Sequence, residues 1–126
     1  MTNEEVAASL EKLAYHVSLL AMTINSEIHP IEALVVARNW SRADLNKVHD
    51  IFERWDKRIE QGGKMNGDDF EADFYRELDI TYQGLKGIVL AFYKNQQWTN
   101  VCEAYVDFFG DSPSAELGSI KRRKRT

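Results

Sequence analysis

The chain of 126 residues is long enough for one domain, and a composition with 44% hydrophobic and 29% charged residues is typical of a globular protein. The first residues are acidic and precede no apolar signal core, and no stretch reaches the roughly eighteen apolar residues of a membrane-spanning helix. Cys102 is the only cysteine, which excludes an internal disulfide and a cysteine-based zinc site. We therefore expect a cytoplasmic protein.

The net charge of −4 is unevenly distributed along the chain. Residues 111–126 hold five basic and two acidic residues, which is +3, so residues 1–110 carry −7. An acidic body repels the phosphate backbone of a nucleic acid. Any contact with nucleic acid is therefore expected through the basic block, which consists of Lys121, Arg122, Arg123, Lys124 and Arg125.

The first predicted helix runs from Thr2 to Asn25, with Thr2 and Glu5 at the spacing of a capping box. Its apolar residues follow one another at alternating spacings of four and three, which places them on one face. Small alanines lie beside this face, and Leu19 and Met22 add apolar surface on the far side. Such a helix is normally central and buried. The apolar seam consists of Val6, Leu10, Leu13, Val17, Leu20 and Ile24.

We interpret the remaining helices as elements that cover this first helix, either in the same subunit or in a copy of it. The run from Ala33 to Ala37 is also apolar on every side. Two such stretches are easier to bury when copies share them than inside one short monomer. The pattern therefore predicts a homo-oligomer, a trimer or a dimer, with the seam in the subunit interface.

Five further helices are predicted in chain order. Pro30 begins a short one, because proline suits the first helical position, and Asn39 suits the left-handed residue at its end. A capping box of Ser41 and Asp44 begins the next, and the glycine-containing loop from Gly62 to Gly67 follows it. The predicted ranges are 30–38, 41–61, 68–78, 81–95 and 98–109.

Together these helices predict an all-α bundle of five to six helices in one domain, residues 1–110. Gly84 and Gly87 lower the helix propensity of their segment by about 1 kcal/mol each, so we expect close helix contact or local irregularity there. Residues 111–126 combine few apolar residues with a proline, serines and the basic block. This composition predicts a disordered tail.

The order of segments resembles the YhaI-like family of small multihelical bacterial proteins. The similarity lies in LEKLAYHVSLL, in HPIEALVVARNWSRADL and in ITYQGLKGIVLAFYKNQQWTNVCEAYVDFF, and covers about residues 8–109. It implies a multihelical fold, an intertwined homo-oligomer and a bacterial origin. No activity is established for that family, so the resemblance transfers no functional residue, and the tail extends beyond its usual end.

No catalytic, cofactor or metal site is assigned from the sequence. His49 and Glu53 are one helical turn apart, with Asp50 nearby, but this spacing supplies no third or fourth metal ligand. Cys102 has no cationic neighbour in the sequence that would lower its pKa, so it is interpreted as a buried structural residue. The chain lacks the phosphate-binding, dinucleotide-binding and hydrolase motifs, and the carboxylates between Asp68 and Asp79 are most simply a solvated face.

The sequence therefore favours a non-enzymatic, self-associating interaction or regulatory protein over an enzyme. The alternative is a nucleic-acid-binding protein. Residues 30–55 have the spacing of a helix-turn-helix, although the exposed set on the second helix is close to neutral. The basic block from Lys121 to Arg125 could instead bind a phosphate backbone without sequence selectivity.

Overall fold

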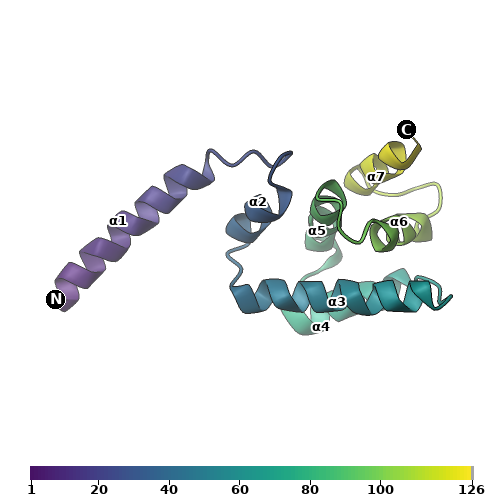
Figure 1. Ribbon diagram of the computed structural model, residues 1–126, viewed down its shortest axis with the longest axis horizontal. Helices are drawn as coiled ribbons and strands as arrows, with labels where there is room; N and C mark the ends of the chain where they lie inside the picture. The colour runs from purple at the N-terminus through teal and green to yellow at the C-terminus, as the bar shows by residue number, and fades with distance from the viewer. Residues whose placement is uncertain (126) are drawn as a thin grey trace.

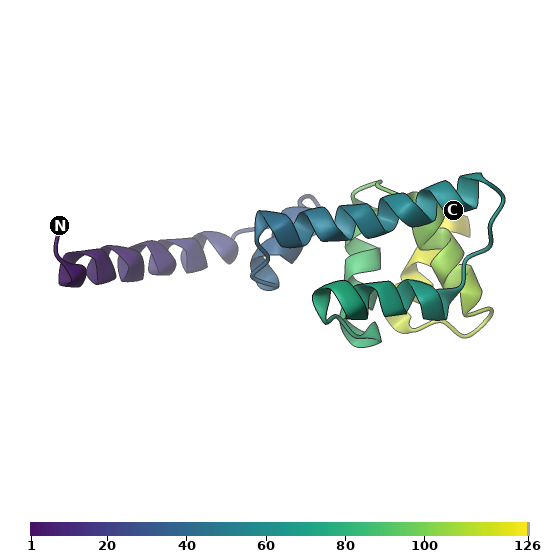
Figure 2. The same cartoon turned by 90° about the horizontal axis from the view of Figure 1, so that it is seen from below.

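A computed structural model describes residues 1–125, which form seven α-helices and no strand. The all-α class is confirmed, and the structure has more helices than the five to six predicted. Helices α2 to α7 form one body, and α1 projects away from it (Figures 1 and 2). The helices are α1 Asn3–Ala21, α2 Pro30–Ala37, α3 Arg42–Glu60, α4 Gly67–Leu78, α5 Tyr82–Lys94, α6 Thr99–Phe108 and α7 Ala115–Arg125.

The ends of several helices lie where their local sequence predicts. The Asp44 backbone N–H donates to the Ser41 hydroxyl at 3.1 Å, and the Ser41 N–H donates to the Asp44 carboxylate at 2.9 Å, which completes a capping box at the start of α3. These hydrogen bonds also lower the pKa of Asp44. Pro30 is the first residue of α2, and Asn39 adopts the left-handed conformation after it with φ of 54°. Short-range hydrogen bonding and backbone sterics explain these ends.

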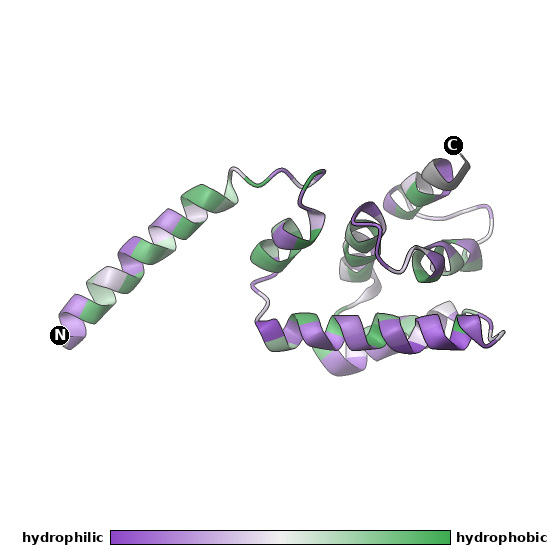
Figure 3. Cartoon of the chain, viewed as in Figure 1, coloured by the Kyte–Doolittle hydropathy of each residue, from purple (hydrophilic) through white to green (hydrophobic). Residues whose placement is uncertain are grey.

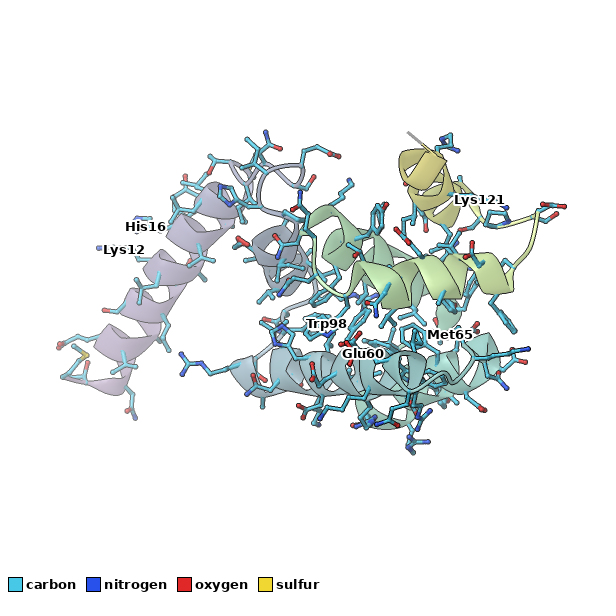
Figure 4. All side chains as sticks on the ribbon, turned by 45° about the vertical axis from the view of Figure 1, so that its right-hand side comes forward. Lys12, His16, Glu60, Met65, Trp98 and Lys121 are labelled. Carbon is cyan, nitrogen blue, oxygen red and sulfur yellow. The ribbon has the colours of Figure 1, made fainter. Side chains whose placement is uncertain are left out.

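The core of the body is an aromatic cluster centred on Phe52 of α3. Its ring lies 5.7 Å from Phe70 and 5.8 Å from Phe74 on α4, and 4.8 Å from Phe92 on α5. The indole of Trp98, at the start of α6, stacks on Phe52 at 5.4 Å, and Figure 4 shows Trp98 in the space between α3 and α6. Four helices therefore meet at one fully buried side chain.

A polar network fixes α4 against α3 beside this cluster. Among the residues that the structure describes, Asp73 is the only charged residue that is buried. Its carboxylate accepts a hydrogen bond from the Trp55 indole N–H at 2.8 Å and one from Arg76 at 2.5 Å. Arg54 lies 3.9 Å from the same carboxylate. Both carboxylate oxygens of Asp73 therefore accept a hydrogen bond, as burial of a carboxylate requires.

The prediction of a disordered tail from residue 111 is wrong for residues 115–125, which form α7. Leu117 and Ile120 are fully buried, and α7 packs on α5 and α6. Two apolar residues three positions apart lie on one face of a helix, and the many polar residues around this pair hide it in the composition of the segment. The domain therefore extends beyond residue 110. Thr126 and the side chains of Arg123, Lys124 and Arg125 lie outside the described residues.

Cover of the first helix within the same subunit, one of the two arrangements that the sequence left open, is not seen in the described residues. Helix α1 ends at Ala21, four residues earlier than predicted, and within residues 1–125 it has no buried residue. The other six helices complete their core without it (Figure 1).

Replacing Leu117 by alanine should lower the free energy of unfolding by about 2–5 kcal/mol, because it leaves a cavity under α7. Urea denaturation at one fixed protein concentration measures this. The matched control is Ile28→Ala, which removes an aliphatic side chain that is 67% exposed and should cost far less. Equal small losses for both variants would mean that α7 does not pack on the body.

Candidate functional site

The apolar seam lies along the projecting helix α1 and faces solvent. Leu10, Leu13 and Leu20 are 60%, 58% and 66% exposed, although leucine is normally among the most buried residues. Figure 3 shows hydrophobic segments along the whole of α1, with no other helix against them. Val6 and Val17 complete the part of the seam within α1, while Ile24 follows the helix end and is half-buried. The structure thus brings five of the six predicted residues onto one exposed face.

The exposed face is broader than the seam alone. Ala7, Ala14 and Ala21 lie beside the seam one heptad apart, at positions where two-stranded coiled coils usually carry charges. Small apolar residues there widen the contact face and let a neighbouring backbone approach closely. Helix α1 is therefore suited to pack against more than one neighbouring element.

Helix α1 carries an acidic net charge, since Glu4, Glu5 and Glu11 outnumber Lys12. Figure 4 shows Lys12 and His16 on α1, away from the body. Amphipathic helices that bind anionic membrane surfaces are rich in lysine and arginine on their polar face. The charge of α1 therefore favours a protein as the partner of the seam over an anionic lipid surface.

A hydrogen-bonded linker, residues 22–29, holds α1 in its outward direction. The backbone N–H groups of Ile28 and His29 donate to the Asn25 carbonyl at 3.1 and 2.7 Å. Glu27 forms an ion pair with Lys94 at the end of α5, with 2.6 Å between Nζ and Oε1. The second half of the linker is thereby attached to the body.

The three histidines have different surroundings. His49 packs its ring at 5.8 Å from Phe92 and 5.3 Å from Trp98, which places it at the edge of the aromatic cluster. His29 precedes α2 and lies 3.5 Å from the Glu32 carboxylate. His16 lies on exposed α1. Among residues 1–125 the structure assembles no group of three metal-ligating side chains, so His49 gains no further ligand there.

Cys102 is fully buried, as expected of a structural cysteine. Its thiol lies 3.5 Å from the Val89 carbonyl oxygen. Burial raises the pKa of this thiol far above its ordinary range, and the Glu103 charge adds to the effect. The thiolate is the reactive form of cysteine, so the folded protein holds Cys102 in its unreactive state.

A polar hollow of about 580 Å³ lies where the end of α2 and the start of α3 approach the end of α4. Arg38 and Arg76 line it together with Asp44, Glu77 and Asp79. These charges already have roles within the fold, since Arg76 bonds to buried Asp73 and Asp44 caps α3. The lining shows no nucleophile and base in hydrogen-bond contact and therefore no catalytic arrangement.

The basic block is partly used within the subunit. The Lys121 ammonium donates to the Gly110 carbonyl at 2.8 Å and lies 3.7 Å from the Asp111 carboxylate (Figure 4). Arg122 is exposed. Of the five cations, Lys121 therefore helps to fasten α7 to the preceding loop, and Arg122 is available to an external partner.

The helices expected to form a helix-turn-helix, α2 and α3, do not pack chiefly on each other. Helix α2 packs mainly on α5, and α3 packs on α4 and α6. The exposed residues at the start of α3 include Arg42 and Lys47, and Asn46 and Asp50 accompany them. A recognition helix normally presents basic or amide side chains and lies against its partner helix, so this packing lends the specific DNA-binding alternative no support.

Comparison with protein-family models, with curated proteins and with solved structures found no match for this chain. The resemblance to the YhaI-like family stays a prediction. Among the described residues, no helix combines the length and apolar character needed to cross a bilayer.

The buried Cys102 thiol makes the stability of the protein dependent on alkaline pH. The unfolded chain releases this proton from about pH 8.5, whereas the folded protein retains it because its pKa is raised. The free energy of unfolding should therefore be highest below about pH 8.5 and fall as the pH rises, by at most about 1.4 kcal/mol per unit from this group.

Urea denaturation at several pH values between about 7.5 and 9.5 measures this loss. The control is Cys102→Ala, whose stability should fall less steeply over the same range. Parallel curves for the two proteins would show that the thiol proton is not linked to folding.

Proposed function

We propose that this protein is a non-enzymatic, self-associating helical protein of the cytoplasm, which uses α1 to join copies of itself and acts through protein–protein interaction. The observation that carries the proposal is the exposed apolar face of α1, with leucines more than half accessible along its length. Contiguous apolar patches of this kind mark interaction sites on proteins.

The stability of α1 itself requires a partner. A helix of 19 residues is marginal in water by itself, and most helical stability in proteins comes from packing of an apolar face. Within residues 1–125, no other helix lies against this face (Figures 1 and 2). A second copy supplies an identical apolar face at once, and isologous contacts of this kind are the commonest form of oligomer.

Replacing Leu13 by aspartate should convert the oligomer into monomers, because the charge would have to be buried in the interface. Size-exclusion chromatography with light scattering measures the mass of the untagged protein. Circular dichroism should show that helices α2 to α7 remain folded, since Leu13 contacts none of their buried core.

The matched control is Leu19→Asp, which makes the same substitution about 120° around the helix from Leu13 and should leave the assembly intact. If Leu13→Asp assembles like the unmodified protein, the proposed interface is wrong. A monomeric unmodified protein would refute self-association altogether.

Non-specific nucleic-acid binding is the second candidate, favoured by the helical α7 that carries the basic block. The same chromatography at low and high salt, with absorbance at two ultraviolet wavelengths, tests it. Nucleic acid that co-elutes at low salt and separates at high salt would support this function, because phosphate contacts release counterions. Deletion of residues 121–126 should then abolish the co-elution.

A further inference from the structure

An apolar groove lies between α2 and α5, next to the base of the projecting helix. It has a volume of about 240 Å³ and is lined by Pro30, Ala33 and Leu34 on one side and by Gly87, Leu90 and Ala91 on the other. Ser26 and Lys94 lie at its rim. Small residues and larger aliphatic ones line it together, so the groove is suited to an apolar side chain.

The groove is lined by a glycine, Gly87, that lies inside helix α5. Glycine inside a helix costs about 1 kcal/mol relative to alanine, and such a residue often marks close approach of another element. A Cβ atom added at Gly84 would meet the Arg38 side chain, which confirms the close contact expected there. A Cβ atom added at Gly87 would meet nothing within 4 Å. The subunit itself therefore gives no packing reason for a glycine at position 87.

We propose that this groove receives the α1 helix of a second copy, with a seam leucine lying over Gly87. The inference rests on the proposed self-association and names the surface that α1 contacts. The groove is smaller than the roughly 300–1,000 Å³ of small-molecule sites, yet larger than an engineered cavity of about 150 Å³ that holds benzene in another protein. Its size and lining suit one or two aliphatic side chains.

The occupant is the helix of another copy because a subunit's own α1 is directed away from its groove. Ser26 and Pro30, which belong to the linker and the start of α2, form part of the groove wall. The Glu27–Lys94 ion pair holds this linker on α5, and α1 leads outward from it (Figure 1). Reciprocal exchange of α1 between two or three copies leaves this arrangement of linker and body unchanged.

The area available on α1 also favours a contact with the body of the partner. A helix of 19 residues is about 28 Å long and offers a neighbouring helix one side, about 10 Å wide. Stable interfaces bury roughly 800 Å² on each partner. A contact between two α1 helices alone falls short of this area, and insertion of each helix into the partner's groove adds surface from α2 and α5.

The decisive experiment fills the groove by the substitution Gly87→Leu. The Cβ atom of the leucine meets nothing within 4 Å in its own subunit, and leucine raises helix propensity relative to glycine, so the body should stay folded. Overfilling the groove should raise the dissociation constant of the assembly by on the order of 10- to 100-fold. Analytical ultracentrifugation over a range of concentrations measures this constant.

A second variant tests the same contact through the cost of burying a charge. Gly87→Asp places a charge that remains in water in the monomer, because Gly87 is exposed, but would be buried beneath α1 in the assembly. The matched control is Glu53→Leu on α3, which adds an exposed leucine outside the groove and should leave the dissociation constant unchanged.

The Gly87 variants test the groove contact, and Leu13→Asp tests self-association through α1. Weakened assembly for both Gly87 variants, with folded monomers, supports the exchange of α1. Normal assembly of both Gly87 variants, while Leu13→Asp is monomeric, overturns the groove and leaves self-association through α1 standing. Normal assembly of all three variants overturns both proposals.

Discussion

The packing of four aromatic side chains around Phe52 positions most of the helices of this protein. Phe52 on α3 contacts two rings on α4, one on α5 and the indole before α6. Each aromatic ring buries a large apolar area and prefers particular tilted or edge-to-face arrangements. The relative positions of four helices are thereby specified at one point. Helices α2 and α7 are then added on α5, whose outer surface they share.

This core is complete without α1, and that fact explains the shape of the molecule. Residues of α2 to α7 and their connections form the buried core of the body, and no residue of α1 takes part in it. The linker, held by the Glu27–Lys94 pair, turns the helix outward. The chain thus carries an uncovered apolar helix and, beside its base, an unfilled apolar groove. Reciprocal packing between copies would satisfy both without any change in the body.

For the C-terminal segment, the average composition failed to predict a packed helix. Pro113, the serines and the basic block leave few apolar residues among 111–126, and this polar composition is the reason that the sequence predicts disorder there. Leu117 and Ile120 nevertheless anchor α7, because burial depends on the spacing of two residues and on a receiving surface elsewhere. That surface, on α5 and α6, is distant in sequence and cannot be inferred from the segment itself. The basic residues follow on the same helix, after the anchoring pair.

Local sequence patterns were sufficient to predict the helical class, most helix ends, the apolar seam of α1 and the buried character of Cys102. These features depend on capping hydrogen bonds, on proline and asparagine backbone preferences and on helical periodicity, all of which act over a few residues. Contacts between distant residues determine that α1 projects while α7 packs, and that Gly84 meets Arg38 whereas Gly87 borders open space. An apolar face indicates that a helix packs against another element, but which element this is depends on contacts between residues far apart in the chain.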